Sequence, residues 1–233
     1  MEQPYSPEPI KIRPFQSPDR TAVYEIFGLT AYHGRSCDFF FDHKEWLAEL
    51  VVDTYLDFEP SACFVAEKNG RIVGYLTGTL DTIQMHRVWI RKILPRLCLH
   101  FVSWGVWKFP RTWRFFWKAI LSALKKEGRY PREVREEFPA HLHINILPRF
   151  HRQGLGQLLV ARFVEYLREK NVWRVHARTS RPDGRHPFFE RLGFKPLLKQ
   201  ELHLWDYVDD KSYTLITYGL SLKNEPFPVI KTL

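Results

Sequence analysis

A strand that turns sharply into a glycine-opened helix is the feature that most constrains the fold of this 233-residue chain. The segment 140–146 alternates in polarity as a half-buried strand does, and Pro148 follows it. Gly154 and Gly156 come next, and apolar residues then recur at helical spacing to about Lys170. The first amides of such a helix have no intrahelical partner, so they favour an anion at the strand end. The segment therefore predicts a phosphate-binding turn, in which both glycines let the backbone approach the anion.

Two common phosphate-binding motifs are absent from this turn. It lacks the Gly-Lys-Ser/Thr of a Walker A loop, and it has no third glycine at the spacing of a dinucleotide-binding fingerprint. Taken alone, Gly154-x-Gly156 could also be an ordinary tight turn between a strand and a helix.

The remaining segments predict one domain of mixed strands and helices. Asn69-Gly70 is a strong hairpin signal between two apolar runs, and Gly193 is a helix C-cap. We expect an α/β domain at 10–222 with loose tails at 1–9 and 223–233. The expected strands are 10–15, 62–67, 71–78, 140–146, 173–178, 194–205 and 213–222. The expected helices begin near 17, 44, 154 and 187, and the helix that begins at 44 is expected to run to 56.

Charge and cysteine content limit the class of protein. The net charge of +9 favours an anionic partner, which could be a phosphate-bearing cofactor, nucleic acid or an acidic membrane surface. The three widely spaced cysteines predict neither a disulfide framework nor a cysteine zinc site, and we expect no metal. No secretory signal is visible, and the longest uncharged stretch, 97–107, is shorter than the roughly 20 residues of a spanning helix. We therefore expect a cytoplasmic protein.

A basic, aromatic stretch separates two of the expected strands. Residues 82–126 contain ten Lys and Arg, no Asp or Glu, and five of the eight tryptophans. We interpret 82–138 as an insert that holds a pair of helices, one on each side of Pro110. It could be a lid over an acceptor cleft, a weak contact for an anionic membrane, or added helices with a solvated outer face. Nucleic acid is not favoured, because no recognised binding motif accompanies the charge.

The whole pattern resembles the Gcn5-related N-acetyltransferase (GNAT) superfamily. The carriers of the resemblance are the Gln/Arg-x-x-Gly-x-Gly/Ala-like loop 151–156, the segment Phe-Phe-Glu-Arg-Leu-Gly-Phe at 188–194, and the hairpin 63–78. The resemblance implies a mixed, mostly antiparallel sheet, splayed in the middle and flanked by helices. It also implies acetyl-CoA as co-substrate, with backbone groups of Asn145, Ile146 and Leu147 on the pantetheine arm and acetyl carbonyl. The pyrophosphate would lie on His151, Arg152, Gln153, Gly154, Leu155, Gly156 and Gln157.

The sequence departs from the family pattern at three places. His151 replaces the usual Gln or Arg, and Pro182-Asp183-Gly184-Arg185 offers no asparagine for the pantetheine. Phe189, at a cofactor-binding position, replaces a tyrosine that often protonates the leaving thiolate, and a phenyl ring cannot donate a proton. Water or another residue must then act as the acid; Tyr207, Tyr213 and Tyr218 are candidates on the last strands.

His141 and His143 are the candidate general bases. They alternate with apolar residues, so both share one face of a strand with Asn145. The intrinsic pKa of histidine suits removal of an amine proton, and the run also resembles the paired histidines of arylalkylamine N-acetyltransferases, one residue out of register. Packing within a buried strand is the other interpretation. Glu67 and Asp81 are weaker candidates, and His176 and His186 are expected to be structural.

These observations predict an N-acetyltransferase that moves the acetyl group of acetyl-CoA directly to a primary amine, on a small molecule or a protein. Two alternatives are a CoA-binding regulatory module without turnover and a basic membrane- or partner-binding adaptor on the same fold. The sequence does not specify the acceptor, the acyl length or whether the chain forms a homodimer.

Overall fold

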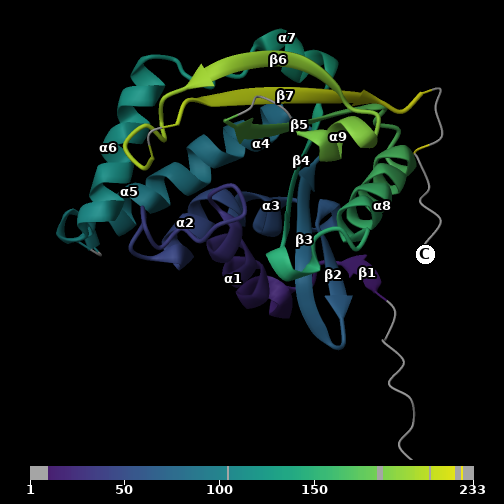
Figure 1. Cartoon of the computed structure of the whole chain (residues 1–233), viewed down its shortest axis with the longest axis horizontal. Helices are drawn as coiled ribbons and strands as arrows, with labels where there is room; N and C mark the ends of the chain where they lie inside the picture. The colour runs from purple at the N-terminus through teal and green to yellow at the C-terminus, as the bar shows by residue number, and fades with distance from the viewer. Residues whose placement is uncertain (1–9, 104, 183–185, 210, 224–226, 228–233) are drawn as a thin grey trace, which may run out of the picture.

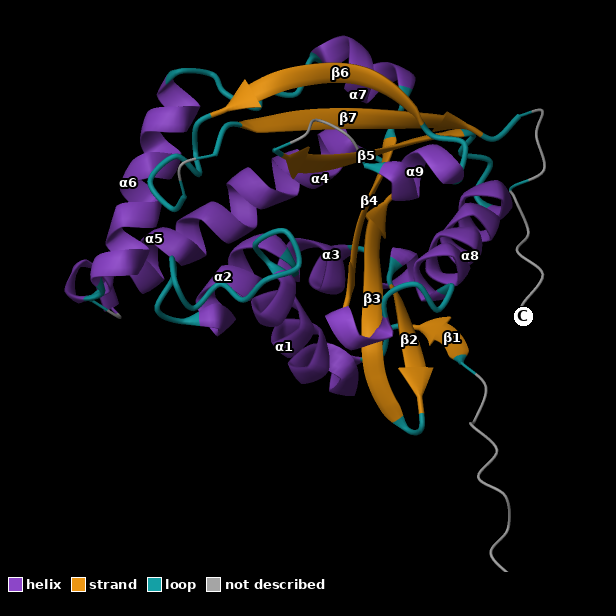
Figure 2. Cartoon of the chain, viewed as in Figure 1, coloured by secondary structure: helices purple, strands orange, loops and turns teal. Residues whose placement is uncertain are grey.

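The computed structural model describes residues 10–103, 105–182, 186–209, 211–223 and 227. The expected tails at 1–9 and most of 223–233, Trp104 of the insert, and Asp183–Arg185 lie outside these residues. The described chain forms a seven-stranded sheet in the order β1-β2-β3-β4-β5-β7-β6, flanked by helices (Figures 1 and 2). The strands are β1 (Lys11–Pro14), β2 (Phe64–Lys68), β3 (Arg71–Thr79), β4 (Ala140–Ile146), β5 (Arg174–Arg181), β6 (Lys195–Leu202) and β7 (Tyr213–Ser221).

The centre of the sheet opens between β4 and β5. Every other neighbouring pair is antiparallel, whereas β4 and β5 are parallel and pair only from Ala140–Val175 to Leu142–Ala177. Beyond that point β4 continues to Ile146 and β5 to Arg181 without pairing to each other. The expected mixed, mostly antiparallel sheet that splays in the middle is therefore confirmed.

Helices cover both faces of the sheet and enclose two apolar cores. On one face α8 packs on β1 to β4, and on the other α1 and α3 pack on β3 and β4. Side chains alternate along each strand, so on β3 Leu76 faces the core with Phe163 of α8 while its neighbour Tyr75 lies in the opposite core with Tyr55 of α3. The helices are α1 (Arg20–Thr30), α2 (Lys44–Val51), α3 (Asp53–Phe58), α4 (Thr82–Val88), α5 (Leu94–Ser103), α6 (Pro110–Leu124), α7 (Arg132–Glu137), α8 (Leu155–Glu169) and α9 (Pro187–Arg191).

The single helix expected over 44–56 is wrong, because the structure divides it into α2 and α3 at Val52. The change of direction places Asp53 within reach of Arg20 on α1, whose guanidinium donates to its carboxylate at 2.6 Å. Tyr24 of α1 also donates to Asp53. The buried carboxylate thus gains two partners at the break, which apolar spacing alone could not reveal.

The segment between β3 and β4 contains more helical structure than the pair that we expected. A π-helical turn, Trp89–Ile93, joins α4 to α5, so the chain is helical without a break through these three elements. The second helix, α6, begins at Pro110 as expected from the preference of proline for a first turn, and α7 follows it. Phe101 of α5 contacts both Trp113 and Phe116 of α6, at ring separations of 5.8 and 5.7 Å. The two long helices therefore pack on each other.

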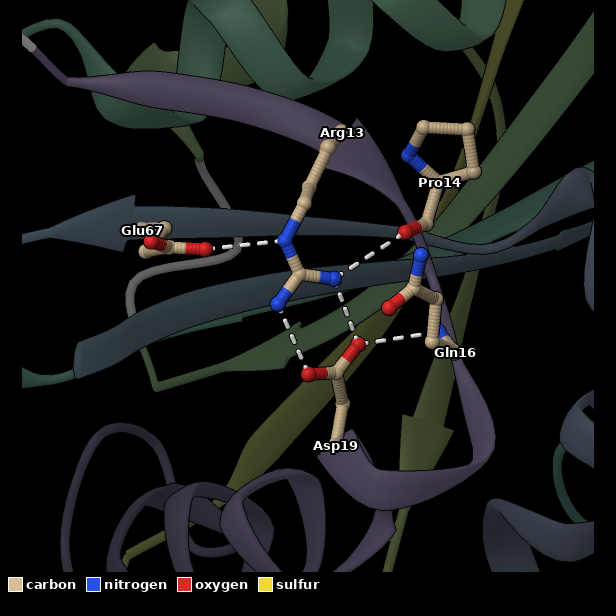
Figure 3. Close-up of polar contacts among 5 residues, drawn as sticks. All are labelled: Arg13, Pro14, Gln16, Asp19 and Glu67. Atoms are coloured by element: carbon tan, nitrogen blue, oxygen red, sulfur yellow. Dashed lines mark hydrogen bonds and ion pairs between the residues drawn. The ribbon is translucent and has the colours of Figure 1, made fainter. Parts of the chain in front are cut away.

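An arginine near the start of the sheet ties β1 to two other segments (Figure 3). Arg13 donates two hydrogen bonds to the carboxylate of Asp19, at 2.7 and 2.8 Å, and one to Glu67 of β2 at 2.8 Å. Asp19 also accepts the backbone N–H of Gln16 at 2.8 Å. The hydrogen bonds from Arg13 lower the pKa of Asp19 despite its burial.

We predict that Asp19→Asn lowers the free energy of unfolding at pH 7 by about 2 kcal/mol, because a charged, bidentate partner of Arg13 is lost. A carboxylate with a lowered folded-state pKa stabilises the fold above its unfolded pKa, near 4, and this contribution is lost as the pH falls further. Urea denaturation at pH 7 and pH 3 measures both effects. An equal loss at the two pH values would contradict the assignment, and Glu25→Gln on the exposed face of α1 is the control.

Candidate functional site

The loop between β4 and α8 is shaped by two left-handed residues. A short 3₁₀ turn, Pro148–Phe150, follows β4, and then Arg152 has a φ of 61° and Gly154 a φ of 78°. Gly154 is the N-cap of α8, and the left-handed region costs glycine little. A loop that alternates between left- and right-handed residues turns successive N–H groups into one concave surface, which suits an anion. The expected turn is present at the expected place.

The two glycines of the loop have different structural roles. A Cβ on Gly154 would meet nothing within 4 Å, so the backbone there is open to a ligand. A Cβ on Gly156 would lie 2.8 Å from the ring of Phe188 and 3.3 Å from Ile146 Cδ1. Gly156 therefore allows α9 and β4 to pack closely on the first turn of α8. We had expected both glycines to serve the approach of an anion.

The backbone of β4 beyond its pairing with β5 presents alternate residues to the opening. Leu147 donates its N–H to Val73 of β3 at 3.0 Å. Since successive strand residues direct their amides to opposite edges, Asn145 and Leu147 face β3, whereas Ile144 and Ile146 face the opening. His151 reaches back to the carbonyl of Ile146, with its Nε2 2.8 Å away. Of the three residues expected on a pantetheine arm, Ile146 directs its backbone groups toward the opening, whereas Asn145 and Leu147 direct theirs toward β3.

The side chain of Asn145 has a structural contact. Its Nδ2 donates to Thr30 Oγ1 at 2.6 Å, and that hydroxyl in turn donates to the carbonyl of Ile26. The contact links β4 to the end of α1.

The other expected loop residues differ in their exposure to solvent. Arg152 and Gln153 are exposed, whereas Leu155 and Gln157 are buried at the start of α8.

An open depression of about 380 Å³ lies beside the loop, between it and the β2–β3 hairpin. Lys68 donates to Gln153 of the loop at 3.0 Å, and the cations of Lys68 and Arg149 lie over the ring of Phe150. Three cations on its lining make the depression attractive to phosphate groups. The lining residues are Lys68, Asn69, Arg71, Val73, Arg149 and Phe150. Sequence analysis missed the hairpin cations, and their position on either side of Asn69-Gly70 was the only available signal.

Phe189 lies in the core and not at the opening. Its ring packs on Phe194 and Tyr218, at 5.3 and 5.7 Å. The hydroxyl of Tyr218 accepts the N–H of His186 and donates to Glu190. Of the other candidate acids, Tyr213 lies 2.8 Å from the hydroxyl of Tyr32 and donates to Asp209. The ring of Tyr207 packs under Arg114, and its hydroxyl is buried without a hydrogen-bond partner among the described residues.

Three histidines meet at and just beyond the short paired segment of β4 and β5. His141 and His176 are register partners, and their rings stack at 4.7 Å across the two strands. His143 lies 4.5 Å from His141 by ring centroid, on the first residue of β4 past the pairing. His176 is held at both ring nitrogens, by Phe138 O at 2.7 Å and Tyr130 OH at 2.8 Å. In contrast, His141 Nε2 is buried with no hydrogen-bond partner among the described residues.

The surroundings keep this cluster neutral. Burial is the largest effect that lowers the pKa of all three histidines, to about 4 for His143 and His176. The nearby positive charge of Arg178 lowers them further. Tyr55 of α3 closes the cluster from the helix side, with its ring 5.7 Å from that of His143. Neutral imidazole at pH 7 can accept a proton, so the cluster is a candidate base. Sequence analysis missed Tyr55, Tyr130 and Arg178.

The two carboxylates named as weaker candidates have structural partners. Glu67 is bound by Arg13, and Asp81 accepts the N–H groups of Ile83 and Gln84 as the N-cap of α4. Within the described residues, no group of three His, Cys, Asp or Glu side chains is arranged to hold a metal ion. The described helices also include none that is long and apolar enough to cross a membrane.

Comparison with known proteins gives a family match for the region of the loop and solved structures with a similar fold. Residues 121–194, which span β4, the loop, α8, β5 and α9, match the model of the acetyltransferase (GNAT) family. The crystal structure of a protein named SsHAT has a TM-score of 0.64 at 24% identity, over 92% of this chain and 99% of that one. The structure of yncA, described as an acetyltransferase of Salmonella typhimurium with acetyl-CoA, gives 0.52 at 14% identity over 94% and 98%. Drosophila melanogaster polyamine N-acetyltransferase gives 0.53 at 17% identity, over 92% and 100%.

We predict that Gly156→Ala lowers the free energy of unfolding by about 1–3 kcal/mol, because its Cβ overpacks against Phe188. In a Phe188→Ala background the same substitution should cost much less, and urea denaturation of the four proteins measures the difference. Gly154→Ala is the matched control: it loses about 1 kcal/mol from left-handed strain in either background. An unchanged cost of Gly156→Ala without Phe188 would contradict this role.

Proposed function

We propose that the chain, whose residues 121–194 match the acetyltransferase (GNAT) family, is a Gcn5-related N-acetyltransferase that binds acetyl-CoA at the β4–α8 loop and transfers the acetyl group to a primary amine. The observation that carries the proposal is the open, left-handed Gly154 at the start of α8, next to a β4 edge that has left its partner strand. This arrangement pairs an anion cradle with an opening beside unpaired backbone groups.

The loop and the neighbouring depression fit the phosphate-rich end of CoA. The pyrophosphate would lie on the amides at the start of α8, with Arg152 on the exposed side of the loop. Lys68, Arg71 and Arg149 would attract the remaining phosphate from the adjacent depression. The amide-bearing arm would then follow β4, where Ile144 and Ile146 present their backbone groups toward β5.

The thioester would reach the histidine cluster at the end of the opening where β4 and β5 begin to separate. In the transfer, the amine nitrogen attacks the carbonyl carbon, the carbon–sulfur bond breaks, and the amine gives up a proton. We propose His143 as the acceptor of that proton, because it is the first unpaired residue of β4 and is neutral at pH 7. His141 lies next in the path, with a ring nitrogen that has no hydrogen-bond partner among the described residues. We assign protonation of the leaving thiolate to water, because Phe189 has no proton to donate and the hydroxyls of Tyr213 and Tyr218 already donate to carboxylates.

We expect titration calorimetry to show micromolar binding of acetyl-CoA, with 3′-dephospho-CoA weaker and NADH not bound. Gly154→Glu should remove the binding, because a carboxylate would then project toward the phosphates, whereas Leu29→Glu on the exposed face of α1 should not. A folded Gly154→Glu protein with unchanged affinity would remove the assignment of the loop. If acetyl-CoA binds but no amine in a library causes release of the free thiol of CoA, the alternative of a regulatory module without turnover would be favoured.

The pH dependence of turnover tests the base. We predict that His143→Gln lowers kcat about 100-fold or more at pH 7, the usual scale of general-base catalysis, while His86→Gln on α4 leaves it unchanged. Because the pKa of His143 is about 4, the base stays active through pH 6, so the kcat of the wild type should not fall near pH 6.5.

Stability must be followed in the same pH series. The buried histidines protonate near pH 6.5 when unfolded but only near 4 when folded, so their stabilising contribution is complete above pH 6.5 and is lost toward pH 4. Circular dichroism at each pH separates unfolding from loss of the base. A kcat of His143→Gln equal to that of the wild type would assign this histidine to packing.

A further inference from the structure

The positive charge of the chain is concentrated in the segment between β3 and β4. Ten Lys and Arg lie in 82–126, which leaves 25 basic residues against 26 acidic ones in the rest of the chain. Nine of the ten side chains are exposed, and Lys118 is partly so. None of the ion pairs within the described residues uses any of them. Arg111 donates to the carbonyl of Asp38 and Arg114 lies over the ring of Tyr207, but neither contact neutralises a charge. The positive charge of the segment is therefore available to an anionic partner.

The same segment exposes most of the apolar surface. Of thirteen large hydrophobic side chains that are exposed among the described residues, nine lie between Ile90 and Leu124. Exposed apolar residues scattered singly need no explanation, whereas exposed apolar residues gathered in one segment point to an interaction surface. We call the nine side chains the apolar patch. It consists of Ile90, Leu94, Leu99, Val102, Trp107, Trp113, Trp117, Ile120 and Leu124.

Four of the nine patch residues form a stripe along α6. Trp113, Trp117, Ile120 and Leu124 are spaced by four, three and four residues, so they share one side of the helix. Thr112 and Phe115 lie on another side of the helix and are buried, so α6 packs on the domain through that side and the stripe faces solvent. The exposed fraction is 54% for Trp117 and 74% for Leu124. Arg111, Arg114, Lys118 and Lys125 occupy a third side, next to the stripe.

The second helix of the segment enlarges this surface. Leu99 and Val102 of α5 are 67% and 65% exposed, and Phe101 between them packs on α6. In Figure 1, α5 and α6 lie toward the left end of the molecule, whereas α8 and β1 lie toward the right. Seven of the nine residues of the apolar patch therefore lie on two helices in contact with each other, at a distance along the molecule from the loop that precedes α8.

We propose that the outer face of α5 and α6 binds the surface of an anionic lipid membrane. Helices that lie in the headgroup region carry Trp and Leu on the apolar side and Lys and Arg beside it, as α6 does. Tryptophan is also enriched where lipid meets water. A protein partner would favour few lysines at the centre of the interface, and nucleic acid would leave Leu99, Val102 and Leu124 without apolar contacts. The combination of charge and aliphatic exposure fits lipid best.

Flotation of the full chain with phosphatidylcholine vesicles, with and without 30% phosphatidylserine, tests the proposal. The protein should float with the anionic vesicles, remain free with the neutral ones, and dissociate at high salt, since screening weakens the attraction. The fluorescence of the exposed tryptophans should shift to shorter wavelength on binding. No flotation with anionic vesicles at low salt would overturn the proposal.

Two pairs of variants separate the contributions. Trp113→Ser with Trp117→Ser should abolish flotation, whereas Leu29→Ser with Phe58→Ser, which removes exposed apolar groups elsewhere, should not. Lys118→Gln with Lys125→Gln should weaken binding about 25-fold, which is about 5-fold for each charge removed. The matched control is Lys195→Gln with Lys199→Gln on exposed β6 positions, which should have little effect. Equal losses in the matched pairs would mean that net charge or general hydrophobicity, and not this face, drives binding.

Light scattering of the lipid-free protein distinguishes a second copy of the chain as the occupant. A dimer that Trp113→Ser with Trp117→Ser dissociates, together with no flotation, would assign the face to self-association and overturn the proposal. Titration of acetyl-CoA into the same variants keeps the two functions apart, because the loop before α8 is untouched and its affinity should not change.

Discussion

The short parallel contact between β4 and β5 is the constraint on which the rest of the structure depends. Only three residue pairs join the two halves of the sheet, from Ala140–Val175 to Leu142–Ala177. Longer pairing would close the opening, and no pairing would leave the halves unconnected. The stacked rings of His141 and His176 lie on the middle pair. The contact that holds the sheet together therefore also assembles the neutral histidine cluster, and it ends where the opening between the strands begins.

Much of this architecture follows from local patterns. Alternating polarity predicts β4 over its observed bounds, Asn69-Gly70 predicts the hairpin, and glycine at 154 predicts the start of α8. Each of these signals acts over a few residues, through backbone conformation or one-sided burial. The resemblance to the superfamily then supplied the topology, including the opening, which local patterns do not encode.

The remaining features depend on contacts between distant segments. The close packing that requires Gly156 comes from Phe188, which is 32 positions away, and the burial of Phe189 comes from Tyr218 on β7. The partners of Asp53 divide α2 from α3, although the apolar spacing runs through both. Similarly, Lys68 joins the loop before α8 only because a hairpin and a helix start meet in space. None of these contacts has a short-range signature.

The separation of charge along the chain has a consequence for how the molecule moves. The rest of the chain has almost balanced charge, whereas the segment 82–126, which includes α5 and α6, carries ten cations and no acidic residue. The molecule is therefore electrically asymmetric, with its positive end in this segment. In the field of a negatively charged object such a molecule experiences a torque before any atoms touch, over about one Debye length of 8 Å at physiological salt. Encounters are thus oriented, with the two helices in front and the loop before α8 facing away.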